Sequence, residues 1–173
     1  MPHFSLEDKA QGLVVGIDEA GRGPWAGPVV ACAFIFYDRR VFENYLPWID
    51  DSKKLTSKRR SVLFDVFNDL NHKACAFALG HASVEEIDQF NIRIATLKAM
   101  ERAYLGLGCQ QASLVLVDGN VCPPLSVQTM PVIKGDQISY SIAAASIIAK
   151  VTRDQLMSEL GRAYPQYAWE KNA

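Results

Sequence analysis

The chain has 173 residues, of which 49% are hydrophobic and 21% charged, and its formal net charge is -1 at pH 7. These proportions are ordinary for a globular protein, so we expect one domain over residues 1–173. No apolar run approaches the ~20 residues that cross a bilayer, and the first residues do not resemble a secretion leader. The four cysteines show no paired spacing, which is typical of a reducing compartment. We therefore expect a cytoplasmic protein without a membrane segment.

The hydrophobic pattern predicts alternating strands and helices. In chain order, it predicts strands over 12–17 and 28–36, a helix over 57–70, a strand over 73–80, helices from 83 and over 92–105, strands over 112–117 and 129–133, and a helix over 141–163. The strands are short apolar runs, most of them rich in β-branched residues. The helix over 57–70 has apolar residues at i, i+3, i+4 and i+7. Ser83 and Glu86 form a capping-box sequence, which begins a helix.

Two helices carry further packing information. Leu97, Met100 and Tyr104 share one face of the helix over 92–105. The helix over 141–163 is rich in alanine, and small side chains permit close packing on a sheet. Strands followed by alternating strands and helices imply a mixed α/β sheet covered on both faces.

Three of the predicted strands end at or shortly before acidic residues, and these acids are Asp18, Glu19, Asp118 and Asp136. In open α/β sheets, functional sites form outside the carboxyl ends of the strands. The four acids therefore converge if their strands are neighbours.

Each acid also has a plain structural interpretation. Asp118 lies in a turn sequence, and Asp136 can cap the helix that follows it. Asp18 and Glu19 are harder to explain, because adjacent acids after a buried strand repel one another unless a cation compensates them. Taken together, four carboxylates favour Mg²⁺ or Mn²⁺, and two such ions can promote phosphodiester hydrolysis. The sequence contains no zinc-protease, nucleophile-elbow or P-loop motif.

The charge is unevenly distributed. Residues 51–60 hold five basic residues and one acid, a local charge of +4. The weak net charge of the whole chain is therefore little evidence for or against a nucleic-acid partner. A basic run of this kind is more often a solvated helix face than a phosphate-binding site.

Six ordered blocks resemble type 2 ribonuclease H, the bacterial ribonuclease HII. They are GIDEAGRGP at 16–24, DSKKL at 51–55, EID and NI within 86–92, LVDGN at 116–120, VIKGD at 132–136, and SIAAASIIAKVTRD at 141–154. The resemblance covers essentially the whole chain. It implies a ribonuclease H-like α/β fold, with a five-stranded mixed sheet flanked by helices on both faces.

The resemblance also implies an activity. It implies an endoribonuclease that cuts the RNA strand of RNA/DNA hybrids, and cuts 5′ of ribonucleotides embedded in duplex DNA. The products would carry 3′-hydroxyl and 5′-phosphate ends. Separately from the resemblance, we expect a monomer. The resemblance assigns catalysis and a two-ion Mg²⁺ or Mn²⁺ site to Asp18, Glu19, Asp118 and Asp136.

Gly21, Arg22 and Gly23 match the family's recognition turn, which contacts the 2′-hydroxyl at the junction. The residue types fit this role, because two glycines let the backbone approach a sugar and arginine suits phosphate. A plain glycine-rich turn is the alternative interpretation.

Three further residues are expected to contact substrate. Lys53 and Lys54 match a family position near the substrate backbone, whereas the basic residues at 58–60 can simply solvate the start of a helix. Asn91 is a weaker candidate for a backbone contact, and its interpretation as the N-cap of a helix is equally good.

The sequence departs from the family at its end. Where residues 164–173 stop, the family continues into a Gly-Tyr motif whose tyrosine packs on the junction sugar. Tyr167 matches an earlier position and is not expected to take this role. We expect the fold and metal binding to survive, and ribonucleotide selectivity to suffer.

Two other readings of the sequence stay open. One is an inactive or weakly active hybrid-binding module, and the other is a different ribonuclease H-like nuclease. Intact acids argue against the first, because binding alone does not require four mutually repelling carboxylates. The second would not need the Gly-Arg-Gly turn or the DSKK sequence.

Overall fold

The computed structural model of the chain describes residues 1–109 and 111–172. Its strands are β1 (Leu13–Ala20), β2 (Val29–Phe36), β3 (Cys75–Ala82), β4 (Ala112–Asp118) and β5 (Thr129–Val132). Its α-helices are α1 (Ser57–Asp69), α2 (Val84–Leu107) and α3 (Tyr140–Ala163). Short 3-10 helices are η1 (Arg39–Phe42), η2 (Leu46–Trp48), η3 (Gly135–Gln137), η4 (Pro165–Tyr167) and η5 (Trp169–Asn172).

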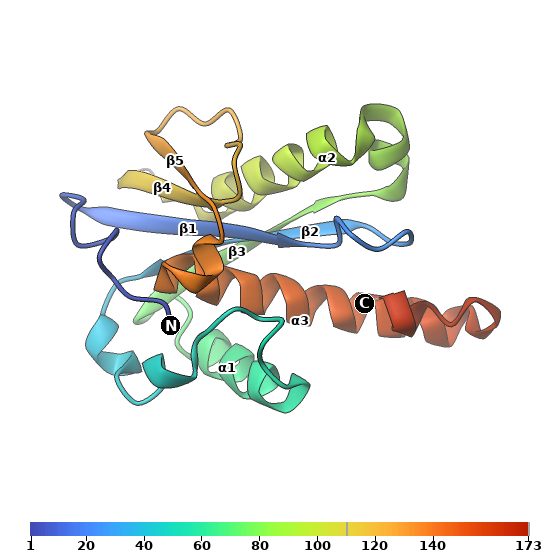
Figure 1. The fold of residues 1–173 in the computed structure, drawn as a ribbon, viewed down its shortest axis with the longest axis horizontal. Coiled ribbons are helices and arrows are strands. Elements are labelled where there is room, and N and C mark those ends of the chain that lie inside the picture. The colour runs from blue at the N-terminus through green and yellow to red at the C-terminus, as the bar shows by residue number, and fades with distance from the viewer. Residues whose placement is uncertain (110, 173) are drawn as a thin grey trace.

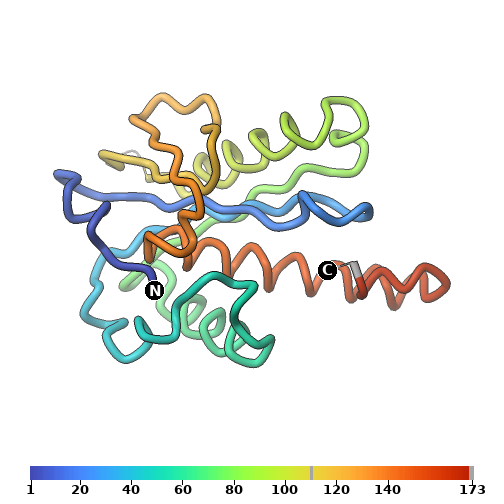
Figure 2. Tube along the Cα trace, in the orientation of Figure 1, coloured from blue at the N-terminus to red at the C-terminus, as the bar shows by residue number. Residues whose placement is uncertain are grey.

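The strands form one sheet in the order β3-β2-β1-β4-β5. β1 pairs antiparallel with β2 and parallel with β4, whereas β2 and β3 are antiparallel and β4 and β5 are parallel. Figure 1 shows α2 on one face of this sheet, and α3 and α1 on the other. In Figure 2 the chain turns back alongside α3 after that helix ends. The predicted five-stranded mixed sheet with helices on both faces is confirmed.

Two strands differ from their predicted bounds by two residues or more. β1 extends to Ala20, so Asp18 and Glu19 lie inside the strand and not after it. The reason is that the antiparallel partner β2 continues the ladder to the end of β1. β3 begins at Cys75 rather than at 73, because the end of α1 continues into a turn that is closed on the carbonyl oxygen of Leu70.

α2 packs on the sheet mainly through small side chains. On the predicted face, Met100 is buried, and Leu97 and Tyr104 are half-buried against the same core cluster. A Cβ atom on Gly80 of β3 would lie 2.0 Å from the carbonyl oxygen of Ala99, so the helix backbone comes too close for large side chains. The fully buried alanines of this face are Ala95, Ala99 and Ala103.

α3 lies directly against β1. A Cβ atom on Gly16 would lie 2.2 Å from the carbonyl carbon of Ser141, so the start of the helix contacts the backbone of the strand. Residues 141–149 are all buried. The predicted close packing of this alanine-rich helix is confirmed, and the contact lies two residues before Asp18.

Aromatic side chains fill the core between the sheet and α1. The rings of Phe34 and Phe67 lie 5.0 Å apart, and those of Phe36 and Phe42 also lie 5.0 Å apart. These are ordinary separations for edge-to-face pairs in a close-packed core. None of the helices described is long and apolar enough to cross a membrane.

Candidate active site

Asp18 and Asp118 lie at the carboxyl ends of neighbouring parallel strands. The ladder between β1 and β4 ends with the pair Ile17 and Val117, so the next residue on each strand is an acid. β5 runs beside the end of β4, and the chain that leaves β5 reaches Asp136 in η3. The structure thus brings the predicted acids to one edge of the sheet.

The turn that carries Asp136 is tied to β4. The N–H group of Gly135 donates a 2.6 Å hydrogen bond to Oδ1 of Asp118. Lys134 has a φ of 56°, in the left-handed region that few side chains adopt. A Cβ atom on Gly135 would lie 2.5 Å from Cδ1 of Ile142, so glycine alone fits here without a shift of neighbouring atoms.

Burial and mutual repulsion raise the pKa values of the acids. Burial raises the pKa of Asp18 well above its ordinary value, and the charges of Glu19, Asp118 and Asp136 raise it further. The N–H group of Glu19 opposes this rise with a 2.7 Å hydrogen bond to Oδ1 of Asp18. Burial also raises the pKa of Asp118, against hydrogen bonds from backbone N–H groups. A cation between these carboxylates would favour their ionised forms.

Glu19 has one oxygen engaged and the other buried without a partner. Its Oε1 accepts a hydrogen bond from Nη1 of Arg22 at 3.2 Å. Its Oε2 has no hydrogen-bond partner among the residues described. Burial raises the pKa of Glu19, and the guanidinium of Arg22 opposes that rise. A buried carboxylate oxygen without a donor is costly, so this position favours a positively charged ligand.

Asp136 faces a fifth acid, Asp51, which the sequence analysis did not single out. Burial, followed by the charges of Asp51 and Asp118, raises the pKa of Asp136 to about 6. Asp51 is buried. Its Oδ1 accepts a 2.9 Å hydrogen bond from the N–H group of Lys53, and its Oδ2 accepts a 3.3 Å hydrogen bond from the side-chain amide of Gln137. Asp51 therefore joins its own loop to η3. The signal in the sequence that could have identified Asp51 was its position at the start of the DSKKL block.

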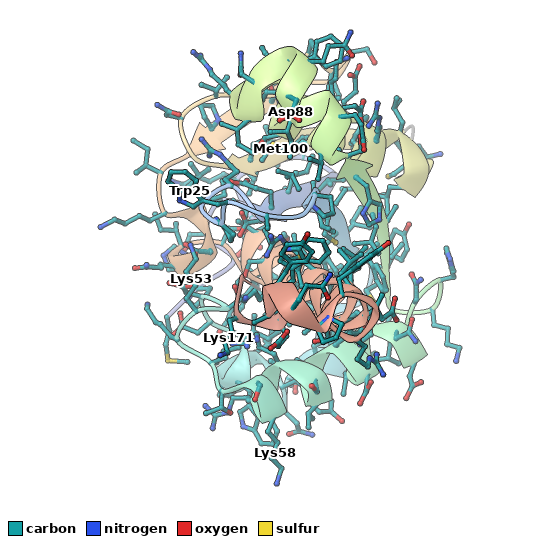
Figure 3. The ribbon with its side chains drawn as sticks, turned by 90° about the vertical axis from the view of Figure 1, so that its right-hand side faces the viewer. Trp25, Lys53, Lys58, Asp88, Met100 and Lys171 are labelled. Carbon is teal, nitrogen blue, oxygen red and sulfur yellow. The ribbon has the colours of Figure 1, made fainter. Side chains whose placement is uncertain are left out.

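The two lysines predicted to contact substrate have different surroundings. Lys53 lowers the pKa values of three of the acids, so its ammonium group lies in their field. Lys54 instead forms an ion pair with Asp50, with 3.5 Å between Nζ and Oδ1. Figure 3 shows Lys53 and the fully exposed Trp25 on the same edge of the molecule, with Lys58 far from both on α1.

A buried arginine of α3 packs against Gly21 and holds the loop that follows the Gly21–Gly23 turn. Arg153 is 1% exposed, and it donates hydrogen bonds to the carbonyl oxygens of Ala26 at 2.7 Å and Pro28 at 3.1 Å. Gly21 has a φ of 108°, and a Cβ atom there would lie 2.4 Å from Nε of Arg153. Gly23 has open space around it. Arg153 was not predicted as a functional residue, although it lies in the last matching block.

Asn91 begins the second half of α2. Its Oδ1 accepts hydrogen bonds from the N–H groups of Arg93 at 3.0 Å and Ile94 at 3.2 Å, which confirms the N-cap interpretation. Its backbone, with φ 69° and ψ 162°, kinks the helix and is rarely adopted by residues other than glycine. A contact between its amide group and substrate stays a prediction.

Tyr167 lies near the end of the described chain, in η4. Its ring stacks on that of Trp169, with centroids 4.8 Å apart and an interplanar angle of 11°. The ring is therefore engaged within its own segment.

The chemistry of the site is that of oxygen donors. In residues 1–109 and 111–172, no three acidic, histidine or cysteine side chains are gathered closely enough to hold a metal ion as they stand. The acids are nevertheless close enough to raise the pKa values of one another. Carboxylate oxygens fit Mg²⁺ or Mn²⁺, and the unpartnered Oε2 of Glu19 is consistent with such an ion.

Carboxylates at neighbouring strand ends of a five-stranded mixed sheet, with helices on both faces, fit a nuclease of the ribonuclease H-like class. The model of the family described as Ribonuclease HII matches residues 15–173. The chain belongs to the ribonuclease HII family. It is therefore a metal-dependent endonuclease of the ribonuclease H type, and its substrate is nucleic acid.

Two relatives illustrate the match. The chain is 48% identical over 171 residues to the ribonuclease HII of Wolbachia sp. subsp. Brugia malayi, covering 99% of this chain and 80% of that protein. It is 49% identical over 173 residues to the ribonuclease HII of Paramagnetospirillum magneticum, covering all of this chain and 84% of that protein.

Solved structures agree with the sequence match. The ribonuclease H2 of Pyrococcus horikoshii superposes with a TM-score of 0.70 at 28% identity, covering 88% of this chain and 77% of that one. The ribonuclease HII of Archaeoglobus fulgidus, solved in complex with PCNA, gives a TM-score of 0.68 at 27% identity, covering 88% and 78%.

Proposed function

We propose that this protein cuts the RNA strand of RNA/DNA hybrids, and cuts 5′ of ribonucleotides embedded in duplex DNA. The products carry 3′-hydroxyl and 5′-phosphate ends. The observation that carries this proposal is the convergence of four acids from three chain segments at one edge of the sheet. The enzyme acts as a monomer in the cytoplasm.

Asp18, Glu19, Asp118 and Asp136 hold two Mg²⁺ or Mn²⁺ ions in this proposal. Two such ions supply an activated water and stabilise the leaving oxygen of the phosphodiester. The protein's own contribution is to hold the acids on strand ends and on the turn tied by Gly135. Bound ions would offset the repulsion between these carboxylates.

Selectivity for ribonucleotides belongs to the Gly-Arg-Gly turn. A metal site hydrolyses RNA and DNA alike, so the enzyme must sense the 2′-hydroxyl elsewhere. The open space around Gly23 lets a sugar approach the backbone. Arg22 is half-exposed beside Glu19 and can contact a phosphate near the metal site. Lys53 contacts the substrate backbone beside the acids in this proposal, and Lys54 and Asn91 are secondary contacts.

The test uses three matched duplexes in Mg²⁺ and in Mn²⁺. One contains DNA only, one has a single embedded ribonucleotide, and one has a full RNA strand. Cleavage confined to the two ribonucleotide-containing duplexes, with the stated ends, supports the proposal. Cutting of plain DNA would instead identify a different ribonuclease H-like nuclease. Binding without cutting would identify a hybrid-binding module.

A further inference from the structure

A cavity of about 290 Å³ opens beside the acids, on the α2 side of the sheet edge. Asp118 forms part of its wall, so the cavity adjoins the site of cleavage. Two cationic side chains from separate segments, Arg22 and Arg93, also line it, together with the amide of Asn120. The buried Met100 of α2, labelled in Figure 3, contributes apolar surface.

Arg93 distinguishes this cavity from an ordinary surface hollow. The side chain is exposed, and it makes no hydrogen bond, ion pair or ring contact with any residue that the structure describes. Several other arginines of the protein are held by carboxylates, such as Arg60 by Asp154 and Arg102 by Glu86. An arginine that the fold leaves unpaired beside a reaction site is available for an anionic ligand.

The lining fits a single phosphodiester with its sugar. Guanidinium groups bind phosphate oxygens through paired N–H donors, and an amide can bind either a phosphate or a sugar hydroxyl. Leu97 and Met100 offer apolar contact to the carbon atoms of the sugar. The volume is at the small end of ligand sites, which suits one nucleotide unit rather than a larger molecule.

We propose that this cavity binds one phosphodiester–sugar unit of the substrate, next to the bond that is cut, through Arg93 and Asn120. The proposal rests on the function proposed above. It makes Arg93 a residue that positions the strand and sets affinity, and leaves the chemical step to the acids.

The test measures binding and cleavage separately. The probe is a fluorescent duplex with one embedded ribonucleotide, titrated with protein in EDTA between 50 and 200 mM salt, where those concentrations are roughly the range in which phosphate contacts weaken. Arg93→Gln removes the charge and keeps a good helix former. We expect Kd to rise about tenfold. The negative slope of log K against log salt should become shallower by about 0.9, the value for one lost phosphate contact.

Two matched variants control for general effects of charge. Arg40→Gln removes an exposed arginine that pairs with Asp38 just after β2, at the end of the sheet away from the acids. It should leave Kd and the salt slope unchanged. Arg93→Lys keeps the charge but loses the planar guanidinium with its paired N–H donors. Its salt slope should therefore equal that of the parent, and its affinity should lie between those of the parent and Arg93→Gln.

Cleavage in Mg²⁺ completes the design. Arg93→Gln should raise KM about tenfold while kcat stays within about twofold, because the lost contact acts on binding and not on the chemical step. A folded Arg93→Gln protein with the Kd, salt slope and KM of the parent would overturn the inference. Failure of the parent itself to cut this duplex would overturn the proposed function instead.

Discussion

The N–H group of Gly135 donates a hydrogen bond to Oδ1 of Asp118, a residue 17 positions earlier in the chain. This bond joins the end of β4 to the turn that carries Asp136. Two acids from distant parts of the sequence are thereby fixed relative to one another by the backbone. The rigidity matters because a metal site depends on the position of each ligand as well as on its charge.

Asp18→Asn should abolish cleavage and keep the fold. The variant loses a charged ligand, so cleavage should fall by at least about a hundredfold. Without metal its melting temperature should equal or exceed that of the parent, because burial and three neighbouring acids disfavour the Asp18 carboxylate. A cleavage assay and thermal melts with and without Mn²⁺ measure the two effects. Retained activity would refute the role of Asp18.

Metal binding should weaken as the pH falls through about 6. The pKa of Asp136 is raised to about 6 by burial and then by Asp51 and Asp118, and a metal ligand must be ionised. The same shift acts on the metal-free protein with the opposite sign. The protonated acid favours the folded state, so this stability is present below about pH 4 and is lost as the pH rises through 6.

Asp51→Asn separates the contribution of the fifth acid. Asparagine keeps an oxygen for the N–H group of Lys53 but removes the charge that acts on Asp136. The pH midpoint of Mn²⁺ binding, measured from melting temperatures between pH 5 and 7, should move to lower pH. Identical midpoints in the variant and the parent would show that Asp51 does not influence Asp136.

Lys53 and Lys54 form a natural matched pair. Lys53→Gln should raise KM about five- to tenfold, because it removes a cation beside the acids where substrate phosphate must lie. Lys54→Gln should change KM by less than about twofold, since this exposed side chain is paired with Asp50. Steady-state kinetics on the embedded-ribonucleotide duplex decide between them. Equal effects would argue against a special position for Lys53.

Arg153→Met should destabilise the fold and loosen the Gly-Arg-Gly turn. The change leaves the carbonyl groups of Ala26 and Pro28 without their donor, at a cost of roughly 2–5 kcal/mol in the free energy of unfolding. Urea denaturation measures this cost. In the fraction that folds, discrimination between ribonucleotide and DNA substrates should fall more than metal affinity. A fully selective variant would show that the turn does not depend on this anchor.

The sequence was enough to predict the sheet and the convergence of its acids, for one physical reason. Residues at the carboxyl ends of parallel neighbours share an edge, so Asp18 and Asp118 could be placed together from strand positions alone. The six matching blocks added the family. Strand positions and matching blocks can both be identified without knowing how side chains pack.

What could not be predicted depends on close contacts between distant segments. α2 packs through alanines because Gly80 allows the helix to approach β3 closely. The helical periodicity of the sequence does not indicate how close a helix lies to its sheet. Arg153 sits in an alanine-rich helix, where a charged side chain is expected to face solvent, yet it is buried under a loop over 120 positions earlier in the chain. Asp51 and Gln137 lie 86 positions apart, so no local pattern of the sequence indicates the hydrogen bond between them.

The pairing of β1 with β4 also bears on how the protein is made. Residues 21–111 separate these strands, so β1 meets its parallel neighbour only when two thirds of the chain has left the ribosome. β1, β2 and β3 can associate earlier, because they are consecutive and antiparallel. During synthesis the growing chain therefore carries Asp18 and Glu19 without their partners. Nucleic-acid cutting becomes possible only once β4, β5 and the turn at Gly135 have joined the sheet.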